Sequence, residues 1–335
     1  MKRFKLSMYV ISAIVVVIIF IFAVALFLSS RSQKYSEVTK VTCRLKWYEQ
    51  SQFAGNFVAV AKGFYKDAGI DCELRSGGQD FNAIKLVAAG ADDFGIWGAD
   101  DIIIARAKGI PVVAIAVIYQ KSPVCFFAKK GAGINGPKDF IGRKVAMQYG
   151  TNVRTEYVAM MNNLGIKLES VQEVPSRFDM QQFFQGKVDV WNGYTINEVL
   201  TAEEQLGEMV VIMPSDYGVN IYADCIFTTE EMIKKRPDLV RSFVRATING
   251  WQYALDHPEE AVDIVIAKNP KLRRSHEMEM LLKSKRLILA RGAEKRGIGS
   301  MSESMWTEME KTLFVQGIIT TRVDVKNAFN ASFLP

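Results

Sequence analysis

Histidine and cysteine are scarce in this sequence. Its 335 residues include 2 histidines and 4 cysteines, and the cysteines stand far apart without a C-x-x-C pair. This spacing excludes a structural zinc site. The sequence also lacks a G-x-S-x-G or H-E-x-x-H motif, and no pairing of a nucleophile with a base stands out. We therefore expect no metal, no cofactor, no catalytic residue and no enzymatic activity.

The four cysteines could still form disulfides in an oxidising compartment. Cys43 with Cys72, and Cys125 with Cys225, could each join neighbouring strands. Four cysteines permit three pairings, and the sequence does not choose among them.

Positive charge is in slight excess, and it gives little support to a nucleic-acid partner. The formal net charge is +6, and Lys2, Arg3 and Lys5 supply three of these units. We interpret the basic clusters of the later chain, such as 271–274 and 283–286, as solvated helix faces. The glycines of GAGINGPK resemble a phosphate loop, but Pro137 stands where that loop needs a lysine. We expect a turn there, followed by a helix that begins at Pro137.

One long apolar run predicts a membrane anchor. Residues 8–28 carry no charge and are numerous enough to cross a bilayer as a helix. The basic residues before the run, by the positive-inside rule, place the amino terminus in the cytoplasm and the rest outside. Ala23 and Ala25 offer an A-x-A-like cleavage pattern, but the run exceeds an ordinary signal peptide core, which favours an uncleaved anchor. We expect a single-pass protein of the inner or cytoplasmic membrane with its binding domain on the periplasmic or extracellular side.

The exported part alternates strands and helices, which predicts a parallel α/β fold. Two such α/β runs meet near Ser122 and Pro123, and the pattern turns helical after Thr228. We predict an amino-terminal tail, anchor and linker in residues 1–35, a first lobe in 36–121 and 226–335, and a second lobe in 122–225.

Aromatic and polar side chains follow the predicted strand ends, where open α/β sheets bind ligands. Flat rings beside amides and carboxylates suit a flat, hydrogen-bonding solute. Core packing is the alternative for the tryptophans, and helix capping or a solvated first turn is the alternative for Asp101 and Glu198. The candidates at these strand ends are Trp47, Gln52, Trp97, Asp101, Tyr149, Tyr194, Asn197 and Glu198.

Seven segments of the exported part form a recognisable series. The segments are WYEQSQFAGNFVAVAKGFYKDAGID, KLVAAGADDFGI, ARAKGIPVVAIAVIYQKSP, INGPKDFIGRKVAM, GKVDVWNGYTINE, DYGVNIYAD and RPDLVRSFVRATINGWQYALDHPEEAV. In their order and spacing over residues 41–267, these segments resemble the periplasmic solute-binding proteins of ABC importers. The similarity is to the branch that includes thiamine-pyrimidine-precursor binders and the related nitrate, sulfonate and taurine binders.

The resemblance implies a type II periplasmic binding protein fold, with two α/β lobes that close on a solute in the cleft between them. It implies that Trp47 lies against the ligand plane and that Trp97 and Asp101 face the cleft. Tyr149 and Gly150 would come from the second lobe. Tyr194, Asn197 and Glu198 would make polar contacts with the ligand.

The chain departs from the related eukaryotic pyrimidine synthases. These use a histidine, a lysine and a cysteine-rich loop, whereas the corresponding stretches here hold Asp101, Trp97 and YGVNIYADC. We therefore expect an extracytoplasmic binding protein for a small heterocycle, such as a pyrimidine precursor of thiamine, with importer membrane subunits as partners. A sulfonate, nitrate or taurine binder comes second, because Arg154 is the only basic residue that we expect near the site. A membrane-anchored sensing domain is the remaining alternative.

Overall fold

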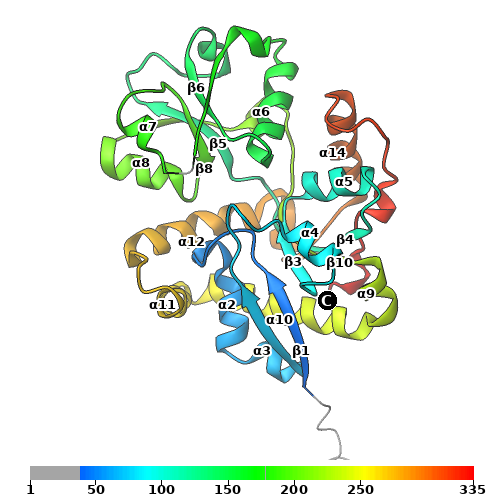
Figure 1. Cartoon of the computed structure of the whole chain (residues 1–335). Coiled ribbons are helices and arrows are strands. Elements are labelled where there is room, and N and C mark those ends of the chain that lie inside the picture. The colour runs from blue at the N-terminus through cyan, green and yellow to red at the C-terminus, as the bar shows by residue number, and fades with distance from the viewer. Residues whose placement is uncertain (1–37, 178) are drawn as a thin grey trace, which may run out of the picture. The chain divides into compact units, whose positions relative to one another are not determined.

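The computed structural model describes residues 38–177 and 179–335. The chain divides into two units, residues 1–39 and 40–335, and the second contains the sheets and helices shown in Figure 1. The predicted anchor, residues 8–28, lies outside the described residues.

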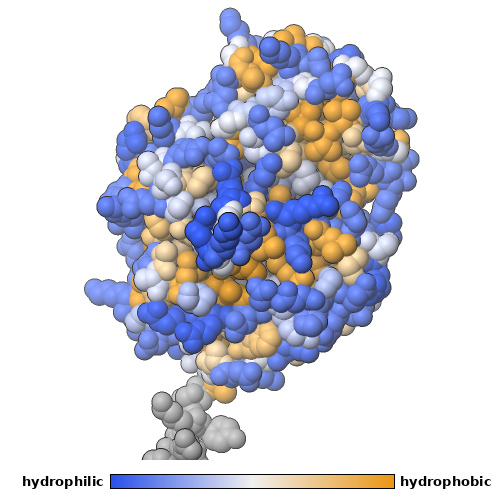
Figure 2. Space-filling view, turned by 180° about the vertical axis from the view of Figure 1, so that it is seen from behind, coloured by the Kyte–Doolittle hydropathy of each residue, from blue (hydrophilic) through white to orange (hydrophobic). Residues whose placement is uncertain are grey.

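The predicted membrane localisation requires correction. Within residues 38–177 and 179–335, no helix is long and apolar enough to cross a bilayer. The longest of them, α10 (Pro237–Asp256), has 20 residues but carries acidic and basic side chains such as Asp238, Arg241 and Arg245. Hydrophilic residues are also spread over the face of the molecule in Figure 2. The predicted localisation as a single-pass membrane protein is therefore contradicted, and a membrane contact through the predicted helix of residues 8–28 is not shown.

The larger sheet has five strands in the order β2-β1-β3-β10-β4. Strands β1 and β3 run parallel, whereas β10 runs antiparallel to both of its neighbours. The predicted parallel α/β pattern does not hold for β10, a strand that we do not predict from the sequence, because an apolar run does not reveal strand direction. The strands are β1 (Thr39–Arg44), β2 (Ile70–Arg75), β3 (Phe94–Trp97), β4 (Val112–Tyr119) and β10 (Ala223–Thr229).

Strand β4 is buried along its whole length, although it is the last strand of the sheet. Its backbone bonds to later parts of the chain: Ala114 N–H donates to Ala328, and Val117 N–H donates to Gly299. These contacts cover an edge that would otherwise expose unpaired backbone groups. A continuous apolar run such as VVAIAVIY is typical of a strand buried on both faces.

Two smaller sheets are formed by the middle of the chain. One has the order β8-β5-β9, with both pairings antiparallel, and the other pairs β6 with β7 in parallel. The predicted strand 188–191 lies three residues later in the structure, so Trp191 begins β8 and is fully buried in its core. The strands are β5 (Val124–Lys129), β6 (Lys144–Met147), β7 (Gln172–Pro175), β8 (Trp191–Tyr194) and β9 (Met209–Ile212).

The helices cover these sheets and fill the carboxyl-terminal half of the chain (Figure 1). The short helix η2 begins at Pro137, as predicted, and helix α12 contains the basic cluster 283–286 that we interpret from the sequence as a helix face. The α-helices besides α10 are α2 (Ala54–Ala61), α3 (Phe64–Asp67), α4 (Ala83–Ala88), α5 (Ala99–Ala107), α6 (Asn152–Asn163), α7 (Gln181–Phe184), α8 (Glu198–Leu206), α9 (Glu230–Lys235), α11 (Pro258–Lys268), α12 (Arg274–Ile288), α13 (Ala293–Arg296) and α14 (Glu303–Val315). The 3-10 helices are η1 (Ser51–Phe53), η2 (Pro137–Phe140), η3 (Leu168–Ser170), η4 (Pro214–Tyr217), η5 (Ala290–Gly292), η6 (Val325–Asn327) and η7 (Ala331–Phe333).

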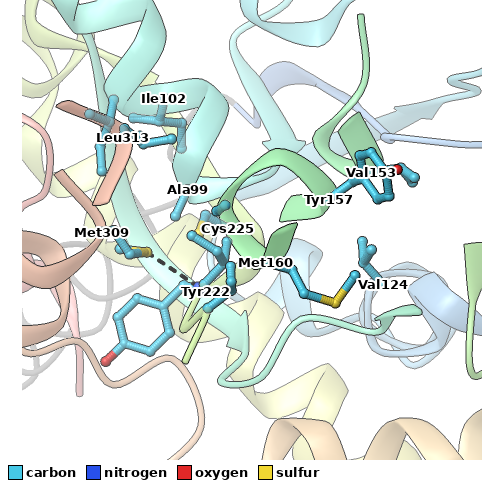
Figure 3. Close-up of a cluster of buried hydrophobic side chains, with 14 of the residues drawn as sticks. Ala99, Ile102, Val124, Val153, Tyr157, Met160, Tyr222, Cys225, Met309 and Leu313 are labelled. Atoms are coloured by element: carbon cyan, nitrogen blue, oxygen red, sulfur yellow. Dashed lines mark hydrogen bonds between the residues drawn. The ribbon is translucent and has the colours of Figure 1, made fainter. Parts of the chain in front are cut away.

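One hydrophobic core joins elements of the larger and the smaller sheets. Figure 3 shows Ala99 of α5, Val124 of β5, Met160 of α6 and Cys225 of β10 gathered in it. All four cysteines of the chain are buried and free, so the structure shows neither of the disulfide pairings that the sequence allowed. The predicted lobe boundaries, residues 121/122 and 225/226, stay a prediction.

Candidate ligand-binding site

A cavity of about 320 Å³ lies where several strand ends meet. Its lining comes from the loop after β1, the loop before α4, the start of α5, the loop before α6 and the turn after β8. All nine residues predicted from the sequence lie on its wall: Trp47, Gln52, Trp97, Asp101, Tyr149, Gly150, Tyr194, Asn197 and Glu198. Their role in binding a ligand stays a prediction.

Aromatic rings form much of the wall. Trp47, Trp97 and Tyr194 are partly buried, so each ring is held by the fold while part of it stays accessible. Tyr149 and Phe81 are more open, with 53% and 45% of their surfaces exposed. Exposed aromatic surface beside a cavity is suited to stacking against a flat molecule.

The loop that carries Gln52 is fixed by buried polar contacts. Ser51 N–H donates to Glu277 Oε2 of α12 at 2.6 Å, and Glu277 is 1% exposed. Gln52 Nε2 donates to Asp224 Oδ2 at 2.7 Å, and Gln52 Oε1 accepts from Gln50 Nε2 at 2.7 Å. Both ends of the Gln52 amide are therefore used inside the protein, which sets the position of this wall.

Lys46 is the basic residue that the sequence analysis missed. Its Nζ donates to Tyr194 Oη at 2.7 Å and lies 3.9 Å from Asp224 Oδ1. Burial lowers the pKa of the Lys46 ammonium, but Tyr194 and Asp224 outweigh burial and raise this pKa above its ordinary value. Burial raises the pKa of Tyr194 to about 12, against the opposing effect of Lys46. Lys46 is therefore charged and the Tyr194 hydroxyl is neutral at neutral pH.

Arg154, which we expected near the site, does not line the cavity. Its guanidinium pairs with Glu173 and lies over the rings of Tyr149 and Tyr157. The sequence predicts a strand over residues 41–45, so Lys46 directly follows a strand end and its position could have been found from the sequence. Lysine is not among the aromatic, amide and acidic residue types that we select at strand ends.

Several carboxyl groups surround Lys46. Burial raises the pKa of Asp100 to about 7, with a further contribution from Asp101, and burial together with Asp100 raises the pKa of Glu156 to about 8. Burial also raises the pKa values of Asp101 and Asp224, against the attraction of Lys46. These raised pKa values mean that the carboxyl groups keep their protons to a higher pH, so each offsets the charge of Lys46 only when it is ionised.

Asp224 holds an uncommon backbone conformation beside the cavity. Its φ of 48° lies in the left-handed region, which few residues other than glycine adopt. The side chain is 2% exposed and contacts both Gln52 and Lys46. No sequence pattern predicts this residue, because its partners lie more than 170 positions away in the chain.

Glu198 uses both carboxylate oxygens within the turn after β8. Its Oε2 accepts from Tyr194 N–H at 2.8 Å, and its Oε1 accepts from Asn197 Nδ2 at 2.9 Å. A Cβ atom at Gly193 would lie 2.6 Å from the Glu198 side chain, so the turn needs glycine there. These contacts favour the capping interpretation of Glu198 over that of a free acceptor.

Comparisons with known proteins agree with this architecture. The model of the family described as NMT1/THI5 like matches residues 50–261. The riboflavin-binding protein RibY of Chloroflexus aurantiacus is 27% identical over 312 residues, which cover 88% of this chain and 86% of that protein. The formylaminopyrimidine-binding protein of Halalkalibacterium halodurans is 23% identical over 298 residues, which cover 87% of this chain and 89% of that protein.

Some relatives are named as enzymes. A 4-amino-5-hydroxymethyl-2-methylpyrimidine phosphate synthase of Legionella pneumophila is 26% identical over 70% of this chain and 75% of its own length. Among solved structures, the periplasmic aliphatic sulphonate binding protein SsuA of Escherichia coli has a TM-score of 0.71 at 14% identity, covering 88% of this chain and 94% of SsuA. At this identity the likeness shows the fold alone. The predicted periplasmic-binding-protein α/β fold and the family resemblance are confirmed.

Proposed function

Because the chain belongs to the NMT1/THI5 like family, we propose that it is a solute-binding protein of an ABC importer and holds a flat nitrogen heterocycle in the cavity. The observation that carries this proposal is the convergence of three partly buried rings, Trp47, Trp97 and Tyr194, on one cavity. Stacked rings contribute about 0.5–1.5 kcal/mol beyond the burial of their surface. The relatives named for riboflavin and formylaminopyrimidine support this class of ligand.

The cavity has the size and the polarity for such a ligand. Its volume of about 320 Å³ falls at the lower end of the range for small-molecule sites, roughly 300–1,000 Å³. Amide side chains line it beside the rings, among them Gln79, Gln148 and Asn152, whereas both ends of the Gln52 and Asn197 amides contact other side chains of the protein. Amides both donate and accept hydrogen bonds, as the edges of a nitrogen heterocycle do.

A sulfonate, nitrate or taurine ligand is the second candidate. Lys46 favours it, because a buried ammonium attracts an oxyanion. The carboxyl groups of Asp101 and Asp224 near the same ammonium oppose it.

We also propose that the protein is not an enzyme. The raised pKa of Lys46 keeps its amine protonated, and a protonated amine is not a nucleophile. Burial raises the pKa values of the thiols of Cys43, Cys125 and Cys225, and it raises that of Cys72 to about 12. Thiols in this state are inert rather than catalytic.

Isothermal titration with the purified protein tests the proposed ligand class. The panel comprises riboflavin, formylaminopyrimidine, 4-amino-5-hydroxymethyl-2-methylpyrimidine, an alkanesulfonate and nitrate. We expect at least one heterocycle to bind, and Trp47→Ala to weaken its binding by about tenfold through the loss of stacking and apolar contact. Phe314→Ala is the control, because Phe314 is an exposed aromatic residue outside the cavity. A protein that binds only the anions, or none of the panel, contradicts the proposal.

A further inference from the structure

The Lys46 ammonium has hydrogen-bonding capacity that its protein contacts do not use. An ammonium has three N–H donors. Among the described residues, Tyr194 Oη accepts one hydrogen bond at 2.7 Å. The nearest carboxylate oxygen, Asp224 Oδ1, lies at 3.9 Å, which is an ion pair but is too long for a hydrogen bond. Since Lys46 lines the cavity, an incoming acceptor can reach the remaining donors.

Aromatic rings flank the same ammonium. Lys46 Nζ lies 5.8 Å from the centroid of the Trp97 ring and 5.5 Å from that of the Tyr194 ring. A ligand that contacts these rings would therefore lie next to the Lys46 ammonium. The side chain is only 11% exposed, so its position is set by the fold rather than by solvent.

The charges around Lys46 select against an anion. Lys46 is the only basic residue among the described residues that line the cavity, which also holds the carboxyl groups of Asp101 and Glu198. Behind the wall, the buried carboxyl groups of Asp100 and Asp224 interact with the same ammonium. An anion at Lys46 would be attracted by one charge and repelled by each of these carboxyl groups that is ionised. An uncharged acceptor, such as a ring carbonyl or a ring nitrogen, gains the hydrogen bond without that repulsion.

We propose that Lys46 determines specificity by donating a hydrogen bond to an uncharged acceptor of the ligand, while Asp101 accepts from a neighbouring ligand N–H. The ligand edge would then carry an acceptor beside a donor, as in an aminopyrimidine or a pyrimidinedione ring. This inference rests on the proposed function and narrows its ligand class, because it excludes sulfonates and nitrate as ligands of Lys46.

Substitution of Lys46 tests the inference, with riboflavin and 4-amino-5-hydroxymethyl-2-methylpyrimidine as uncharged probes and an alkanesulfonate as the anionic probe. Lys46→Met keeps the apolar stem and removes the donor, and Lys46→Gln keeps a neutral N–H donor. For a heterocycle that binds the natural protein, we expect Lys46→Met to weaken binding by about 10- to 100-fold, as for a hydrogen bond with a charged partner. We expect Lys46→Gln to recover a large part of this loss. Lys66→Met is the control, because Lys66 is exposed and lies outside the cavity.

The outcomes separate the two proposals. If no probe heterocycle binds the natural protein, the proposed function falls, and the role of Lys46 falls with it. If a heterocycle binds and Lys46→Met binds it equally well, the proposed function stands and the role of Lys46 is refuted. Tight binding of the sulfonate that is lost in Lys46→Gln refutes the preference for an uncharged acceptor. If Lys46→Met does not fold, the comparison of Lys46→Gln with the natural protein across the three probes decides in the same way.

Discussion

Glu277 anchors the cavity wall from a helix that does not itself line the cavity, and its removal has a calculable cost. Glu277 of α12 is 1% exposed and accepts from Ser51 N–H at 2.6 Å. In Glu277→Ala this buried N–H loses its partner, which costs about 1–3 kcal/mol, and the lost side-chain packing adds to it. We expect a loss of about 2–3 kcal/mol in the free energy of unfolding, equivalent to roughly 3–5 °C in Tm at this chain length.

Urea unfolding and calorimetry measure this effect, and ligand titration shows whether the wall has loosened. Glu279→Ala is the matched control, because Glu279 is an exposed glutamate of the same helix whose closest cation, Lys283, lies at 4.0 Å. The control should lose at most about 0.5 kcal/mol. Glu277→Gln keeps an acceptor oxygen, so its loss in the free energy of unfolding should fall between those of Glu277→Ala and Glu279→Ala. Equal stability of Glu277→Ala and Glu279→Ala would show that the contact with Ser51 does not hold the loop.

Two further perturbations test the packing and the buried charge. A Cβ atom at Gly250 of α10 would lie 2.1 Å from the backbone oxygen of Gly55. Gly250→Ala should therefore lower the free energy of unfolding by about 2 kcal/mol, although alanine has the better helix propensity. The control Gln252→Ala, at an exposed site of the same helix, should leave the free energy of unfolding unchanged. Unchanged stability of Gly250→Ala would refute this close approach of the two helices. Burial raises the pKa of Glu156 from 4.5 to about 8, so the folded protein holds this proton more tightly and stability should fall as pH rises through that window. Glu156→Gln should flatten this dependence in urea titrations between pH 4.5 and 8, and exposed Glu169→Gln should leave it unchanged; an equal slope in both variants contradicts the assignment.

Local structure and the candidate residues could be predicted from the sequence, because they depend on periodicity and on strand ends. The loop after the first strand identified Trp47 and Gln52 in this way, and both line the cavity. The direction of β10 could not be predicted, since a buried strand reads the same in either direction. The pairing of Gln52 with Asp224 could not be predicted either, because their separation of 172 residues leaves no local pattern.

The role of each candidate depends on partners that the sequence does not reveal. The sequence leaves Glu198 as either a ligand acceptor or a capping residue, and in the structure its oxygens accept from Tyr194 N–H and from Asn197 within the same turn. For Lys46 the sequence suggests too little. A single lysine beside a strand end has no distinctive pattern, but its burial between Tyr194 and Asp224 makes it the central charge of the cavity.

Polar contacts between α8 and α12 form a rim next to this cavity. Asn197 Oδ1 lies 2.9 Å from His276 Nε2, and Glu204 pairs with Arg273 beside them. The Glu204–Arg273 pair is largely exposed, and dissolved ions weaken pairs of this kind. The apolar core below, with Val124 of β5 and Cys225 of β10, does not share that sensitivity. Raising the ionic strength should therefore speed the escape of a bound molecule past the rim while the melting temperature of the protein stays nearly constant.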